Sequence, residues 1–171
     1  GFTLAVVTGF LFTAGRNWTG QPTPTGLRLA LLAMLWLTGR VLVLTPWSWA
    51  AAIVNVGFTL SVAAALARPL LASRNRRNYF FIGLLVGMAT AQLAFHLVQL
   101  GVQQWPAWVG LQLGLDVLLL IIAVMTGRVL PMFTNNGVPG AGARASPLIE
   151  KLAVGLLIAL LGFDALQLPS H

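Results

Sequence analysis

Apolar runs of about membrane-spanning length, separated only by short breaks, are the feature that most constrains this sequence. Six of them cover most of its 171 residues: Gly1 to Ala14, Leu27 to Leu44, Ala50 to Ala72, Tyr79 to Val102, Val109 to Leu130 and Glu150 to Leu168. A spanning helix needs about 20 predominantly apolar residues. No polar stretch is long enough for a soluble domain, so we expect an all-α fold. Residues 1–171 are predicted to form a single membrane domain, a bundle of about six transmembrane helices of which the first is truncated.

The composition supports a membrane protein and excludes several kinds of site. Hydrophobic residues make up 58% of the chain and charged residues only 8%, whereas soluble domains carry about a quarter charged residues. The absence of cysteine excludes disulfides, thiolate metal sites and cysteine nucleophiles within this chain. The P-loop, the nucleophile elbow and the HExxH motif are also missing. No catalytic residue is therefore assigned.

The basic residues predict how the helices are oriented. Nine of the ten lie in the breaks, or within the last or first few residues of the runs beside them, on the side where every second break would lie: Arg16, Arg28, Arg68, Arg74, Arg76, Arg77, Arg128, Arg144 and Lys151. The intervening breaks, 45–49 and 101–108, carry no charge and contain Trp47, Trp49, Trp105 and Trp108. The positive-inside rule and the aromatic belt of membrane proteins make loops 14–28, 68–78 and 128–151 cytoplasmic. Because the net charge of +7 lies between apolar runs, it indicates anionic lipid headgroups rather than nucleic acid as partners.

A few polar residues lie inside the predicted spans, where they are costly and are functional candidates by default. They are Arg40, Asn55, His96, Asp116 and Asp164. Counted inward from the charge-free ends at 1.5 Å per residue, all of them fall roughly 6 to 11 Å inside the outer face. Since alternate helices run in opposite directions, the shared depth predicts one polar layer.

We expect Arg40 and Asp116 to pair within this layer, because either charge alone would be costly there. The alternative is that these polar groups only hold the helices together, as hydrogen bonds in membranes can.

His96 is the only histidine inside a predicted span, and imidazole is a ligand for haem iron and for copper. Met88 and Gln92 precede it at steps of four, so the three side chains share one helix face. They are weaker candidates for the same metal. One histidine does not make a closed metal site, so further ligands would come from elsewhere. The alternative is that this polar stripe packs against another helix.

A short repeat favours a second class of function. Thr38 to Leu42 and Thr126 to Leu130 have the same five residues, on predicted helices that run in opposite directions. Inverted three-helix repeats are found in transporters. A polytopic transporter or metal-delivery protein with a buried polar site is therefore the alternative function, and a purely structural membrane subunit is a third.

Several motifs resemble those of NnrS family proteins, which are bacterial inner-membrane haem- and copper-containing proteins of the nitric oxide response. The first is the segment 9–26, which contains Asn17-Trp18-Thr19-Gly20. The others are the segments 35–40, 67–70, 75–79, Phe95-His96 and 127–136, the last containing Gly127-Arg128-Val129-Leu130-Pro131 and Asn135. The resemblance covers nearly the whole chain, although only the first and last of these motifs are specific.

The resemblance implies haem b and copper as cofactors, nitric oxide or a related small ligand as a partner, and a role in resistance to nitrosative stress. The family is about twice this length, with about twelve helices predicted by hydropathy. We therefore expect this chain to be part of a longer protein whose remaining helices are also partners. Carried over by position, His96 is a candidate haem or copper ligand, and Arg40 and Arg128 are membrane-edge arginines. Asn17, Trp18 and Asn135 are motif residues without an assigned role.

The polar layer and the resemblance together give a working hypothesis. It places a b-type haem near the periplasmic side, with His96 as an axial ligand. Arg40 would meet a propionate, since a guanidinium matches a carboxylate with two parallel hydrogen bonds. Asp116 or Asn55 would hold the His96 N–H, which fixes the tautomer of a ligating imidazole.

Overall fold

The computed structural model describes residues 2–106, 108–138, 140–144 and 146–166. Its helices are α1 (Phe2–Thr19), α2 (Gly26–Leu42), α3 (Ser48–Ala72), α4 (Phe80–Gln99), α5 (Trp108–Gly137) and α6 (Pro147–Leu166), with a short 3-10 helix η1 (Arg76–Asn78). No strand occurs in these ranges. The predicted all-α fold of about six helices is confirmed.

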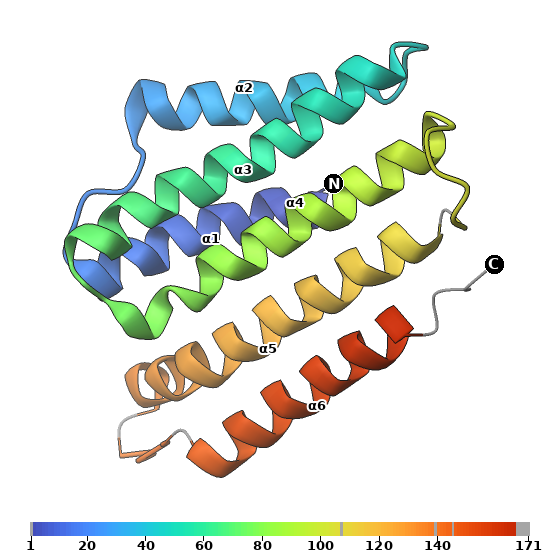
Figure 1. The fold of residues 1–171 in the computed structure, drawn as a ribbon. Helices are drawn as coiled ribbons and strands as arrows, with labels where there is room; N and C mark the ends of the chain where they lie inside the picture. The colour runs from blue at the N-terminus through green and yellow to red at the C-terminus, as the bar shows by residue number, and fades with distance from the viewer. Residues whose placement is uncertain (1, 107, 139, 145, 167–171) are drawn as a thin grey trace. The chain divides into compact units, whose positions relative to one another are not determined.

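The chain forms two compact units, residues 1–110 and 111–171, so the prediction of a single membrane domain stays a prediction. In unit 1 (residues 1–110), α3 is the central helix, because it contacts α1, α2 and α4. Figure 1 shows these four helices side by side with alternating direction. Their core includes Leu11, Leu66, Leu70 and Leu85, all fully buried.

Glycine lets two pairs of helices in unit 1 approach closely. A Cβ atom added at Gly15 on α1 would lie 2.9 Å from Leu66 Cδ1 on α3. One added at Gly110, in the first turn of α5, would lie 2.6 Å from the Phe95 backbone nitrogen on α4. The second approach fixes the start of α5 beside the residue that precedes His96.

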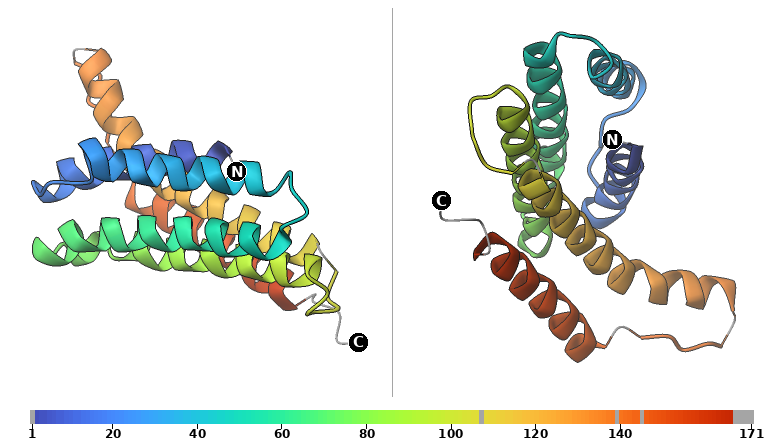
Figure 2. Two further views of the ribbon diagram at one scale, coloured as in Figure 1. Left: turned by 90° about the horizontal axis from the view of Figure 1, so that it is seen from above. Right: turned by 90° about the vertical axis from the view of Figure 1, so that its right-hand side faces the viewer.

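Unit 2 (residues 111–171) consists of the rest of α5 and of α6, which returns alongside it (Figure 1). The sequence predicted that the fifth apolar helix ends at Leu130, whereas α5 continues through Pro131 to Gly137. Figure 2 shows α5 changing direction in this last part. Proline removes a backbone hydrogen bond and crowds the preceding turn, which bends a helix.

Three helices in the described ranges are long and apolar enough to cross a membrane: α3, α4 and α5. Their surfaces carry exposed large apolar side chains, among them Ile53, Leu60, Val86, Leu93 and Ile122. A soluble monomer rarely exposes so much contiguous apolar surface, whereas lipid covers it without cost. At 17 residues, α2 is shorter than a typical span. That α1, α2 and α6 also cross the membrane stays a prediction.

Candidate functional site

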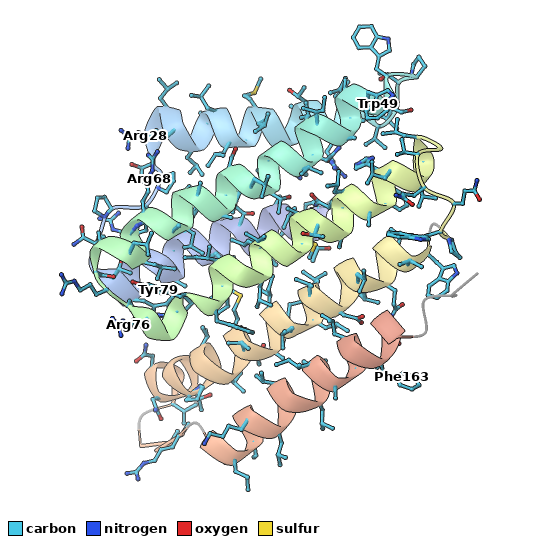
Figure 3. All side chains as sticks on the ribbon, in the orientation of Figure 1. Arg28, Trp49, Arg68, Arg76, Tyr79 and Phe163 are labelled. Atoms are coloured by element: carbon cyan, nitrogen blue, oxygen red, sulfur yellow. The ribbon has the colours of Figure 1, made fainter. Side chains whose placement is uncertain are left out.

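The two ends of unit 1 differ in character. Figure 3 shows Arg28, Arg68 and Arg76 at the end where α1 joins α2 and α3 joins α4, and Trp49 at the opposite end. This is the separation of basic and aromatic residues that the sequence predicted. Which end faces the cytoplasm stays a prediction.

At the basic end, two motif residues have structural partners. The Trp18 ring stacks on Phe81 of α4, with ring centroids 5.3 Å apart and planes 17° apart. Its backbone oxygen accepts a 3.1 Å hydrogen bond from Asn75 Nδ2, and Asn75 Oδ1 accepts another from Asn78. These contacts tie the end of α1 to the α3–α4 connection. Asn17, by contrast, is exposed.

Polar side chains from three helices form a connected group toward the tryptophan end of unit 1. Arg40 Nη2 on α2 donates to Asn55 Oδ1 on α3. Asn55 Nδ2 in turn donates to the Ala51 oxygen at 2.8 Å. One helical turn further along α3, the Thr59 hydroxyl donates to Gln92 Oε1 on α4 at 2.8 Å. We call Arg40, Asn55, Thr59 and Gln92 the unit 1 polar cluster.

Asn55 and Thr59 are buried in this cluster, at 6% and 0% exposed. Buried polar groups in a membrane helix must find partners inside the protein, and the cluster provides them. Gly39 makes room for it, because a Cβ atom there would lie 3.0 Å from Asn55 Oδ1. The cluster therefore locks α2 and α4 to α3 at this level.

Two groups in this region have no hydrogen-bond partner in the described part of the chain. Arg40 Nε is buried and unsatisfied. The half-buried His96 imidazole, one turn beyond Gln92 on α4, makes a ring contact with its neighbour Phe95. Arg40 lies in the last turn of α2 and His96 in the last turn of α4. A guanidinium and an unbonded imidazole thus lie toward the same end of unit 1.

Met88 and Gln92 differ as candidate metal ligands. Met88 is buried, at 7% exposed, and Gln92 uses its carbonyl oxygen to accept from Thr59. Within the described ranges, no three His, Cys, Asp or Glu side chains lie close enough together to hold a metal ion. The described residues therefore do not form a copper site by themselves.

Unit 2 has its own polar group. Gln112 Nε2 donates to Asp116 Oδ1 at 3.3 Å on α5, and to Asp164 Oδ2 at 3.0 Å on α6. Asp116 is 1% exposed. The sequence placed these two acids at one depth, and Gln112 joins them. The predicted pairing of Asp116 with Arg40 connects the two units and stays a prediction, as does a contact between Asp116 and His96.

Asn135, in the last of the sequence motifs, forms hydrogen bonds within the connection between α5 and α6. The Asn135 side chain makes two hydrogen bonds to the backbone of Ala143: its Nδ2 donates to the oxygen at 2.8 Å, and its Oδ1 accepts from the nitrogen at 2.7 Å. An asparagine side chain offers both a donor and an acceptor for such a pair. The side chain of Arg128 lies outside the described residues.

Sequence reasoning missed Thr59 and Gln112. Thr59 lies four residues after Asn55, and Gln112 lies four residues before Asp116. Each therefore shares a helix face with a polar residue that the sequence had identified. That spacing is the signal that would have found them.

Apolar helix surfaces and polar groups buried between helices define a polytopic α-helical membrane protein with an internal polar site. The chain belongs to the NnrS family, because the family described as NnrS protein matches residues 1–171. The resemblance seen in the sequence motifs is confirmed. Among curated proteins and among solved structures, none matches the chain.

The family implies haem and copper as cofactors. An unbonded imidazole fits one axial position of a haem, and a guanidinium with an unsatisfied Nε fits a propionate. The described residues thus fit part of a haem site.

Proposed function

We propose that this protein is a haem protein of the bacterial inner membrane that takes part in the nitric oxide response. Family membership supports haem and copper in general. The observation that carries the proposal for this chain is that an unbonded His96 imidazole and an unsatisfied Arg40 Nε lie toward the same end of unit 1, in the last turns of α4 and α2. When bound, haem iron supplies a site for a diatomic ligand.

In this proposal, the residues of unit 1 bind and orient the cofactor. His96 would hold the haem iron through an imidazole nitrogen from α4. Arg40 would bind a propionate, which would give its half-buried guanidinium the anionic partner that Asn55 does not provide. The hydrogen bond to Asn55 would hold the guanidinium in place before the cofactor binds.

Nitric oxide is the proposed small ligand. It is neutral and dissolves in the bilayer, so it reaches a haem between membrane helices without a hydrophilic channel. The proposed orientation puts the tryptophan end, and the haem with it, near the periplasmic face, and the basic end at the anionic cytoplasmic leaflet.

We propose copper binding only at a site to which other polypeptide segments also contribute ligands. His96 and Met88 are the side chains on α4 whose nitrogen or thioether suits copper. Since neither completes a site among the described residues, the remaining ligands would come from other polypeptide segments.

The test is the haem content and absorbance spectrum of the full-length protein with His96→Ala. We expect the variant to lose haem or to show a shifted Soret band. His171→Ala is the matched control, because it removes the chain's other histidine, and it should leave both unchanged. Normal haem loading and an unaltered spectrum in His96→Ala would remove His96 from the ligand set. A full-length protein without a Soret band would instead favour the transporter alternative.

A further inference from the structure

Unit 2 contains two carboxyl groups that the proposed haem site does not use. Asp116 on α5 is almost fully buried, at 1% exposed, and Asp164 on α6 is half-buried. Gln112 Nε2 donates a hydrogen bond to each of them. One amide group therefore holds two acidic side chains from two helices together.

The second oxygen of Asp116 is buried without a hydrogen-bond partner. The two carboxyl groups lie close together, because both are within hydrogen-bonding distance of the same nitrogen, Gln112 Nε2. Ionised carboxylates are acceptors only, so two of them do not bond to each other, whereas a protonated one donates. A single proton between the two groups would satisfy the unpartnered oxygen.

In the described part of unit 2, no basic side chain forms a hydrogen bond with either acid, and the partner of both is the neutral Gln112. Lys151, on α6, lies roughly 20 Å along the helix axis from Asp164 at 1.5 Å per residue. Arg144 precedes α6, at the same distant end. Two carboxylates held close together in a low-dielectric site do not both ionise readily, because each charge raises the cost of the other.

We propose that Asp116 and Asp164 form a proton-binding site, in which one proton is held between their carboxyl oxygens at neutral pH and Gln112 donates to both. Proton uptake forms one O–H bond on the pair and breaks one O–H bond of the hydronium that delivers the proton, so the charge of the pair changes from −2 to −1. This lowers the cost of placing the pair within the bundle.

The test is infrared difference spectroscopy of the full-length protein at neutral pH, in the region of the protonated carboxyl C=O stretch. We expect a wild-type band that moves on exchange into D₂O. Asp116→Asn and Asp164→Asn should each abolish it, because each removes one side of the same shared proton. Glu150→Gln is the matched control, since Glu150 is the only other acidic residue of the chain, and it should leave the band in place.

The wild-type protein alone also tests the proposal, in case the variants do not fold. Carboxyl-¹³C labelling of aspartate should shift the band, whereas labelling of glutamate should not. The absence of a wild-type band that responds to aspartate labelling would overturn the proposal. A band that appears only in Arg40→Gln would also overturn it, because Asp116 would then be ionised and paired with Arg40. A band that survives Asp164→Asn would show that no proton is shared.

Discussion

Arg40 has a neutral partner, although an arginine inside a membrane bundle usually lies near an acid. The first 115 residues contain no Asp or Glu, so no carboxylate of unit 1 can neutralise it. Its hydrogen bond to Asn55 satisfies one nitrogen and leaves Nε without a partner. The cost of burying Nε of this half-buried side chain is therefore not offset within the described part of unit 1, which is the physical reason for assigning the guanidinium an anionic ligand.

Asn55→Leu removes the hydrogen bond to Arg40 and leaves its half-buried guanidinium without that partner. We expect the free energy of unfolding in detergent micelles to fall by about 1.5–3 kcal/mol, the usual size of a hydrogen bond to a charged group. Asn17→Leu is the matched control, because Asn17 is exposed and should change stability by less than about 0.5 kcal/mol.

Arg40→Leu combined with Asn55→Leu completes a double-mutant cycle. The double variant should be less destabilised than the sum of the two single variants, because it leaves no charge without a partner. Strict additivity would show that the two side chains do not interact.

At the scale of the elements, the helices could be predicted from their apolar runs, but some ends could not. The fifth run stops at Leu130, yet α5 continues for another seven residues, since a bent helix tolerates Pro131 where a straight one does not. The first run stops at Ala14, yet α1 reaches Thr19. There the Trp18–Phe81 stack adds a tertiary contact, and hydropathy does not record such contacts.

The first turn of α5 lies close to Phe95 on α4 because residue 110 is glycine. Gly110→Ala would bring a methyl group within 2.6 Å of the Phe95 backbone, and backbone cannot move aside as a side chain can. We expect a loss of about 1–3 kcal/mol in unfolding free energy. Gly57→Ala on α3 is the control: an added Cβ atom meets nothing within 4 Å. It should be neutral or stabilising by up to about 1 kcal/mol. Equal effects of the two variants would contradict the close approach.

Asn135 holds the α5–α6 connection through two bonds to Ala143. Asn135→Ala should open this loop and speed trypsin cleavage after Arg144, measured by the rate of appearance of the fragments. Asn136→Ala, at an exposed neighbouring position, should leave the rate unchanged. Faster cleavage in both variants would mean that the Asn135 bonds do not close the loop.

At the scale of the whole molecule, the sequence predicted that unit 1 has a basic end and a tryptophan end. This was possible because basic residues and tryptophans gather at alternate breaks between the apolar runs. Part of the polar layer was also predictable from depth: Arg40 meets Asn55, and Asp116 meets Asp164 through Gln112. The partners were not predictable, because depth gives the level of a residue along a helix but not the face on which it lies. Asn55 was thus identified as a polar residue, but not as the partner of Arg40.

The orientation can be tested with single cysteines, because the chain contains none. Ser73→Cys lies at the basic end after α3, and Ser48→Cys lies at the exposed start of α3 near Trp49. We expect a membrane-impermeant maleimide added to spheroplasts to label Ser48→Cys, and to label Ser73→Cys only after the membrane is broken. The reverse pattern would invert the proposed topology.

The most direct test of the haem proposal is ligand replacement at His96. In the ferrous full-length protein, resonance Raman spectroscopy should show an iron–histidine stretch that is lost in His96→Gly. Added imidazole should restore an iron–imidazole stretch in the variant by occupying the space of the deleted side chain, and it should leave the wild type unchanged. An iron–histidine stretch that persists in His96→Gly would contradict axial ligation by His96.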